Sequence, residues 1–135
     1  MRAELLKQTI KDLFPMKRPL SIVGAPGGGK TTIVRTAAQE MGIGYIEKHM
    51  PTMLVEDFGI PDVATDGESF GYKLPDWYPA VGRDDIPEFG ILCFDDRNQA
   101  GDDLQKVLAN IQQARTLHGV KLKAGWTVVS TGNRK

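Results

Sequence analysis

Cysteine is nearly absent from this chain, and long apolar runs are absent altogether. One cysteine, Cys93, occurs among 135 residues, which excludes an internal disulfide framework and fits a reducing cytoplasm. Cys93 stands inside an apolar run, so a small buried side chain is a better interpretation than a reactive thiol. No apolar stretch reaches the roughly 18 residues that a membrane-spanning helix needs, so we expect no membrane partner.

An excess of charge of either sign is also lacking. Lys and Arg number 17, and Asp and Glu also number 17, which removes any electrostatic basis for tight binding of the whole chain to nucleic acid or to a membrane surface. The N-terminus carries Glu4 and no long apolar segment, which is typical of a helix and not of a signal peptide. The length is that of one domain with a core of its own.

What the chain does contain is a glycine-rich segment at residues 24–31 with the pattern G-x-x-x-x-G-K-T. Its glycines allow the backbone to wrap around phosphate oxygens, and the helix that follows adds the positive end of its dipole. We expect Lys30 to reach the β- and γ-phosphates and the Thr31 hydroxyl to ligate Mg²⁺. The predicted nucleotide-binding residues are Gly24, Ala25, Pro26, Gly27, Gly28, Gly29, Lys30, Thr31 and Thr32.

The residues around this segment have the pattern that a phosphate-binding loop requires. An apolar run at 20–23 predicts a short buried strand before it. After it, apolar residues at helical spacing predict a helix over 31–41 that stops at Gly42. A glycine-rich turn that binds nothing is the weaker alternative in this context.

The rest of the chain alternates between predicted helices and predicted strands. Apolar periodicity predicts an N-terminal helix over 2–14, strands at 43–46, 90–94 and 126–133, a hairpin of 60–63 with 70–74 about Asp66-Gly67, and a helix over 102–117 that Gly119 ends. This alternation favours an α/β fold with a mainly parallel sheet.

The predicted strand at 90–94 leads directly into two acids, Asp95 and Asp96. Asp95 can hold Mg²⁺ opposite Thr31, and Asp96 can orient or deprotonate an attacking water. Asn133, just past the last strand, can hydrogen-bond the γ-phosphate or the water through a neutral amide. The alternative interpretation is that Asp95 and Asp96 are solvated acids at a strand end and that Asn133 is an asparagine favoured by a turn.

Together these segments resemble the AAA+ ATPases, and within them the MoxR-like and dynein-related branch of bacteria and phages. Residues 24–31 match Walker A, residues 91–96 match Walker B, residues 55–61 are similar to a D-hydrophobic-G-hydrophobic-P segment, and residues 125–133 are similar to the stretch that ends in sensor 1, here Asn133. The resemblance covers nearly all of residues 1–135. It implies a three-layer α/β/α P-loop NTPase core in which the sensor 1 strand lies between the Walker A and Walker B strands.

The resemblance also implies a function. ATP and Mg²⁺ are the expected cofactors, and Mg²⁺-dependent ATP hydrolysis would be coupled to remodelling of an unidentified protein or nucleoprotein partner by a homo-oligomeric ring, a hexamer in a full-length protein. In this scheme Asp96, Lys30 and Asn133 are the catalytic residues, and Thr31 and Asp95 hold the metal.

Two features depart from the family pattern. The family's usual Asp-Glu pair is Asp95-Asp96 here, which shortens the carboxylate that faces the water and predicts slow hydrolysis. Sensor 1 is followed within two residues by Lys135, so the fifth strand, the arginine finger and the helical lid domain with sensor 2 are expected to be missing from a truncated core.

Two other classes of function stay open at this stage. A nucleotide-dependent switch or assembly module with little turnover is favoured by Asp96 and the missing finger, whereas a P-loop kinase for a small molecule is disfavoured by Asn133 and by the absence of an Arg-rich lid. A cluster of aromatics, Phe70, Tyr72, Trp77 and Tyr78, is expected to pack the hairpin rather than grip a polypeptide. His118, Lys121 and Lys123 are expected on a solvated hairpin, and His49 has no predicted role.

Overall fold

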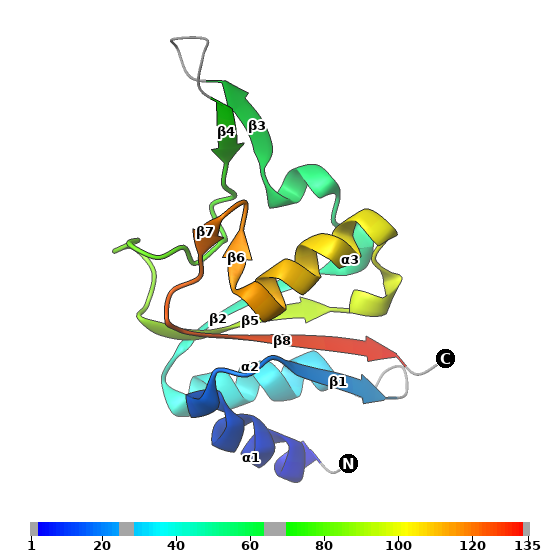
Figure 1. The fold of residues 1–135 in the computed structure, drawn as a ribbon. Coiled ribbons are helices and arrows are strands. Elements are labelled where there is room, and N and C mark those ends of the chain that lie inside the picture. Colours follow the sequence, from blue (N-terminus) through cyan, green and yellow to red (C-terminus); the bar gives the residue numbers. More distant parts are fainter. Residues whose placement is uncertain (1–2, 25–28, 64–69, 134–135) are drawn as a thin grey trace.

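Four parallel strands form the centre of the fold in the computed structural model, which describes residues 3–24, 29–63 and 70–133 (Figure 1). They are β1 (Leu20–Gly24), β2 (Gly44–His49), β5 (Phe89–Asp95) and β8 (Gly125–Asn133), and they lie in the order β1-β8-β5-β2. The predicted sensor 1 strand, β8, therefore lies between β1 and β5, as expected. Helices cover both faces of the sheet, which makes three layers.

Two helices, α1 (Ala3–Leu13) and α2 (Lys30–Met41), pack on one face of the sheet. Leu6 and Ile10 of α1 are buried, and α2 ends at Gly42, whose φ of 70° suits a residue without a side chain. Cys93 is buried within this layer, in agreement with its apolar surroundings. The core here consists of Leu6, Ile10, Ile22, Val34, Ala37, Ala38, Ile91, Cys93 and Val129.

Helix α3 (Asp102–Ala109) packs on the opposite face and continues as a π-helical turn, Asn110–Ala114. Trp126 and Tyr78 are each 1% exposed in this second core. Trp77 packs edge-on against Phe58 and Phe94. Trp77 and Tyr78 therefore pack in the core. That the aromatic cluster packs the hairpin stays a prediction, because the side chains of Phe70 and Tyr72 lie outside the described part of the chain.

The predicted hairpin is present as β3 (Ile60–Val63) paired antiparallel with β4 (Phe70–Lys73), and it projects from the sheet (Figure 1). Its predicted turn at Asp66-Gly67 falls outside the described residues.

The predicted helix over 102–117 is wrong at its C-terminal end. Helical structure stops at Ala114, because Arg115 adopts a left-handed φ of 59°, and a second hairpin follows, β6 (Thr116–Leu117) with β7 (Val120–Lys121). Gly119 lies in the tight turn of this hairpin and not at a helix end, since His118 and Gly119 both have positive φ. The prediction that Lys123 lies on a solvated hairpin is also wrong. Lys123 is 6% exposed and pairs with Glu88 at 3.1 Å.

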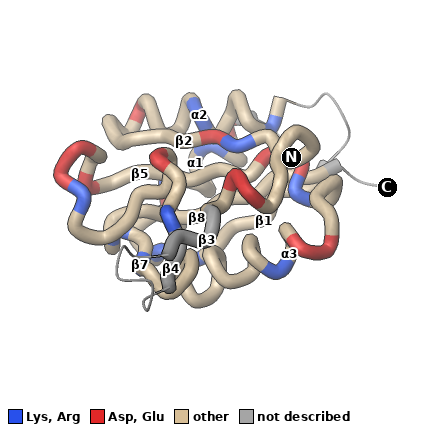
Figure 2. Tube along the Cα trace, turned by 90° about the horizontal axis from the view of Figure 1, so that it is seen from above, with Lys and Arg blue, Asp and Glu red and all other residues tan. Residues whose placement is uncertain are grey.

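Along the Cα trace, Lys and Arg positions are interspersed with Asp and Glu positions, and in this view neither sign gathers on one side (Figure 2). None of the helices in the described ranges combines the length and apolar character that crossing a bilayer would take. Both observations agree with the balanced charge and the short apolar runs of the sequence.

Candidate functional site

The site lies at the edge of the sheet where the parallel strands end. Strand β1 ends at Gly24, and α2 begins at Lys30 after the glycine-rich loop. Gly29 has a φ of 69°, a left-handed conformation that glycine adopts without steric cost, and its carbonyl accepts the first helical hydrogen bond, from the Ile33 N–H at 3.1 Å. The predicted loop residues Ala25, Pro26, Gly27 and Gly28 lie outside the described residues.

Three neighbouring strands each contribute one polar side chain at this edge. His49 and Asp95 are partners in the register of β2 and β5, and Thr131 lies one residue beyond the last paired position of β8 with β5. Side chains alternate along a strand, so Asp95 faces the same side as Cys93, towards α1 and α2. Thr131, two residues after Val129, faces that side for the same reason.

Both carboxylate oxygens of Asp95 accept hydrogen bonds. The Thr131 hydroxyl donates to Asp95 Oδ1 at 2.8 Å, and His49 Nδ1 lies 2.7 Å from Asp95 Oδ2. Thr131 is 2% exposed, whereas the side chain of Asp95 is 24% exposed. Asp95 is therefore oriented from both sides while its carboxylate still reaches solvent.

Asp96 leaves the strand in a left-handed conformation with a φ of 57°. Continued extension would turn this residue to the opposite face of the sheet from Asp95. Instead, one donor atom from each of Asp96, Asp95 and His49 lies within 4.8 Å of the others. The Asp96 N–H donates to the Thr131 hydroxyl at 3.3 Å, so Thr131 contacts both acidic positions.

Thr31 lies in the first turn of α2, and its backbone carbonyl is 3.5 Å from the Tyr45 hydroxyl on β2. The Tyr45 hydroxyl also donates to Glu47 at 2.7 Å, and Glu47 pairs with Arg35 of α2 at 3.1 Å. These contacts fasten the start of α2 to the strand that carries His49. An aspartate carboxylate and a threonine hydroxyl are the hard oxygen donors that Mg²⁺ prefers, so the residues at this edge fit that ion.

Asn133 is the last residue of β8, and its backbone lies beside Gly24 of β1. The start of the glycine-rich loop and the predicted sensor position are therefore neighbours. The side chain of Asn133 lies outside what the structure describes, and its predicted role stays a prediction.

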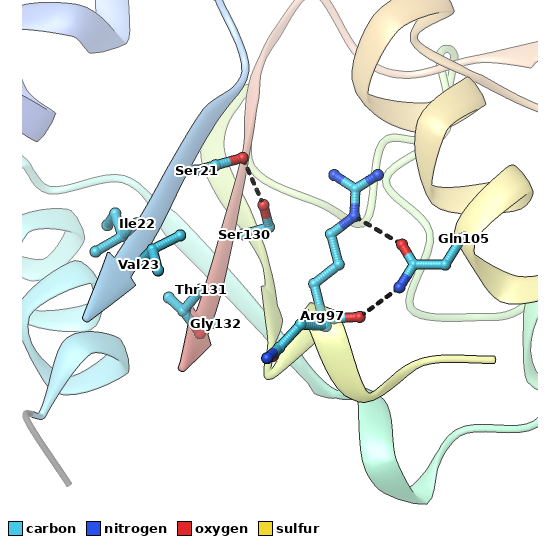
Figure 3. A pocket seen from close by; sticks show the side chains of 9 residues that line it. Ser21, Ile22, Val23, Arg97, Gln105, Ser130, Thr131 and Gly132 are labelled. Carbon is cyan, nitrogen blue, oxygen red and sulfur yellow. Dashed lines mark hydrogen bonds between the residues drawn. The ribbon is translucent and has the colours of Figure 1, made fainter. Parts of the chain in front are cut away.

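A cavity of about 320 Å³ lies between residues of β1 and β8 on one side and Arg97 and Gln105 on the other (Figure 3). Ser21 and Ser130 approach each other there at 3.1 Å, and the guanidinium of Arg97 donates to Gln105 at 3.3 Å. Burial lowers the pKa of Arg97. Its lining includes none of Lys30, Thr31, Asp95 and Asp96, but it includes Thr131, whose hydroxyl donates to Asp95.

Two residues of this site were not predicted from the sequence. His49 had no assigned role, and Thr131 was treated only as part of a strand. Their position was the only indication in the sequence, because His49 and Thr131 are polar residues at or near the end of a predicted strand. Their contact with Asp95 depends on sheet order and register, which the sequence alone does not state.

Comparison with known proteins agrees with this architecture. The family model described as "ATPase family associated with various cellular activities (AAA)" matches residues 20–133. Two similar solved structures are an inferred ATPase of Cytophaga hutchinsonii ATCC 33406 (TM-score 0.61, 18% identity, 96% of this chain) and NtrX of Brucella abortus (TM-score 0.59, 19% identity, 98% of this chain). This chain spans only 38% and 30% of their respective lengths. No curated protein sequence matches it.

A parallel sheet ordered β1-β8-β5-β2, with helices on both faces and a glycine-rich loop between β1 and α2, defines an α/β P-loop NTPase core. The family match extends over most of the chain, so this protein belongs to the AAA family of ATPases.

Proposed function

We propose that this chain binds ATP together with Mg²⁺ and hydrolyses it. The observation that carries the proposal is the meeting of three segments at one edge of the sheet: the start of α2 at Lys30, the end of β5 at Asp95 and the end of β8 at Asn133. In open α/β sheets, ligands bind outside the carboxyl ends of the strands.

The loop and the start of α2 form the phosphate-binding part of the proposed site. Gly29 already has the left-handed backbone that the loop needs at its junction with the helix. Lys30 would place its ammonium against the β- and γ-phosphates, and the backbone N–H groups of the first turn would complete the cradle. The proposed nucleotide contacts extend from Gly24 to Thr32.

Thr31 and Asp95 would hold Mg²⁺, which when bound neutralises charge on the phosphate oxygens. Asp95 suits this role because Thr131 and His49 orient its carboxylate and because part of it reaches solvent. Second-sphere partners of this kind position a metal-binding carboxylate before the ion arrives.

Asp96 is the proposed base, and Asn133 the proposed contact to the γ-phosphate or the attacking water. The left-handed backbone of Asp96 keeps a carboxylate oxygen close to Asp95 while its N–H is held by Thr131. A base must lie within hydrogen-bond reach of the proton that it takes. Its side chain is one methylene shorter than the glutamate usual at this position, so we propose slow turnover.

We propose that ATP hydrolysis is coupled to the remodelling of a partner, because the chain resembles the MoxR-like and dynein-related branch of the family. Residues 55–61 and 125–133 carry that resemblance. In a longer protein of this type, a homo-oligomeric ring would use ATP to remodel a protein or nucleoprotein.

A nucleotide-dependent binding switch with little turnover is the second candidate function. Two features favour it. Asp96 stands where the family usually has glutamate, and both carboxylate oxygens of Asp95 already accept hydrogen bonds from protein groups. A single-turnover assay with labelled ATP separates the two candidates, because a switch binds ATP and leaves it intact.

The test of nucleotide binding is Lys30→Ala, with Lys106→Ala as the matched control. Lys106 is exposed on α3, on the other face of the sheet, so its loss leaves the loop untouched. Charge-assisted hydrogen bonds contribute about 1.5–3 kcal/mol each. Titration calorimetry with Mg²⁺-ATP should therefore show at least a roughly tenfold loss of affinity for Lys30→Ala alone. Equal affinities in two folded variants would refute the phosphate-binding assignment.

A further inference from the structure

We propose that the cavity beside Arg97 binds a small organic carboxylate, whose carboxylate pairs with the Arg97 guanidinium and whose short apolar body fills the remaining space. The inference goes beyond the proposed function, because it needs neither Lys30 nor Asp95. It gives Arg97 a ligand-binding role that the sequence did not indicate.

The first argument is the shape of the cavity and its apolar wall. A volume of about 320 Å³ is at the lower end of the range for small-molecule sites. Ser21 and Val23 of β1 line one wall and point away from the α1–α2 core, because Ile22, the residue between them, is buried in that core. Val23 is 61% exposed although it is apolar. The cavity therefore offers a small ligand an apolar surface to cover.

The second argument is that Arg97 is a half-buried cation without an anionic partner in the described part of the chain. Its Nε–H donates to the neutral oxygen of Gln105 at 3.3 Å, and no acceptor among the described residues contacts its two terminal amino groups (Figure 3). A charge that is partly removed from water without a counter-ion costs free energy, which an anionic ligand offsets. The parallel N–H groups of a guanidinium match the two oxygens of a carboxylate.

The third argument is that hydrogen bonds already hold the polar groups of the cavity in place. Gln105 accepts from the Arg97 side chain and also donates to the Arg97 carbonyl at 2.8 Å. Across the cavity, the Ser130 hydroxyl accepts from Gln112 at 3.2 Å and lies 3.1 Å from the Ser21 hydroxyl. Little side-chain order therefore has to be gained when a ligand binds.

The charge of the lining favours a carboxylate over a phosphate. Arg97 is the only charged side chain among the described residues that line the cavity, so it matches one negative charge. A phosphate group carries between one and two negative charges near neutral pH, and inorganic phosphate has no apolar body to cover Val23. A monocarboxylate leaves no charge unmatched.

The experiment titrates the folded chain with phenylacetate, with its uncharged counterpart phenylacetamide and with inorganic phosphate. Calorimetry should give phenylacetate a Kd of about 1 mM or below, and the other two compounds should bind at least tenfold more weakly. In ¹⁵N NMR spectra, phenylacetate should shift the Arg97 Nε–H and the Ser130 amide. It should still bind in the presence of excess Mg²⁺-ATP.

Arg97→Gln should weaken phenylacetate binding at least tenfold. Arg18→Gln is the matched control, because it removes an exposed arginine that does not line the cavity. Val23→Asp places a negative charge on the cavity wall and should also weaken binding. Since Val23 is exposed, this second variant tests the inference even if Arg97→Gln does not fold.

Equal binding of phenylacetate and phenylacetamide, or an unaltered affinity in folded Arg97→Gln or Val23→Asp protein, would overturn the inference. So would the absence of binding to the folded wild-type chain. Displacement of phenylacetate by Mg²⁺-ATP would assign the cavity to the nucleotide and also overturn it. If the wild-type chain binds phenylacetate but not Mg²⁺-ATP, the proposed function has failed and this inference stands.

Discussion

At the scale of single residues, Thr131 connects the two acids of the candidate site. Its hydroxyl donates to Asp95 Oδ1 and accepts from the Asp96 N–H, and it is 2% exposed. A hydroxyl can do both because it has one donor and two acceptor positions. Valine has the same shape without either capacity, so substitution isolates these hydrogen bonds from packing.

We predict that Thr131→Val lowers the free energy of unfolding by about 1–3 kcal/mol, because the part-buried Asp96 N–H loses its acceptor and Asp95 loses a donor. The same change should weaken the Mg²⁺ dependence of ATP binding, since Asp95 loses one of the bonds that orient it. Urea unfolding and calorimetric titration measure the two effects. Thr131→Ser keeps the hydroxyl and serves as the control; a similar loss in both variants would assign the effect to the methyl group instead.

Cys93 shows how burial changes a titratable group. Its side chain is fully enclosed, and burial raises the pKa of the thiol to about 12, from an ordinary value of 9.0. The unfolded chain releases this proton at lower pH than the folded chain does. The contribution of the thiol to stability is therefore complete below about pH 9 and is lost as the pH rises towards 12.

We predict that the free energy of unfolding falls between pH 9 and pH 11 and that part of the fall is absent in Cys93→Ala. Tyr78, whose pKa burial raises to about 12, contributes to the same fall and remains in the variant. Urea unfolding curves at several pH values supply the measurement. If the two proteins lose stability equally as the pH rises, the pKa of the Cys93 thiol is the same in the folded and unfolded states, and the prediction is wrong.

At the scale of elements, two glycines make room for one indole in the central sheet. Gly44, Gly90 and Trp126 lie side by side on β2, β5 and β8. A Cβ on Gly90 would lie 2.5 Å from the ring of Trp126, and one on Gly44 would lie 3.1 Å from it. The Trp126 indole N–H also donates to the Pro87 carbonyl at 2.8 Å, so the ring cannot move away without losing this bond.

We predict that Gly90→Ala destabilises the fold by roughly 1–3 kcal/mol, the usual cost of overpacking. Gly101→Ser is the control: position 101 is the N-cap of α3, a Cβ there meets nothing within 4 Å, and serine is a favoured N-cap residue. Urea midpoints compare the two variants. A Gly90→Ala protein as stable as the wild type would mean that the indole has another position available.

At the scale of the whole molecule, the sheet order gathers residues that are distant in the chain. Thr131 contacts Asp95 across 36 positions, and His49 contacts Asp95 across 46. The order β1-β8-β5-β2 also places the end of β8 beside the start of the glycine-rich loop. A cavity near this edge is lined by Arg97 and Gln105 and also by Thr131, which contacts Asp95.

We predict that ATP turnover by this chain is slow at every protein concentration, because no arginine is among its predicted site residues. In the proposed scheme an arginine from a neighbouring subunit stabilises the transition state, and such residues contribute about 10³–10⁵ in rate in P-loop enzymes. Turnover of labelled ATP is measured against concentration, with light scattering to report association. Rapid turnover by a monomer, independent of concentration, would contradict a subunit-supplied arginine.

The sequence by itself determined those features that depend on neighbouring residues. Residues 24–31 have the sequence pattern of a phosphate-binding loop, and this pattern can be recognised because it belongs to one short segment. Gly42 ends α2 because a local left-handed backbone requires it. The periodicity of apolar residues located the central strands and both buried faces, and the family resemblance supplied their order.

Only the tertiary structure decided the features that depend on register. It showed that helical structure stops at Ala114, because Arg115 and a short hairpin take the chain away from the helix axis. It turned Asp96 back towards Asp95 through one left-handed residue. It placed His49 and Thr131 on either side of Asp95, since parallel strands bring residues of equal height together irrespective of their separation in the chain.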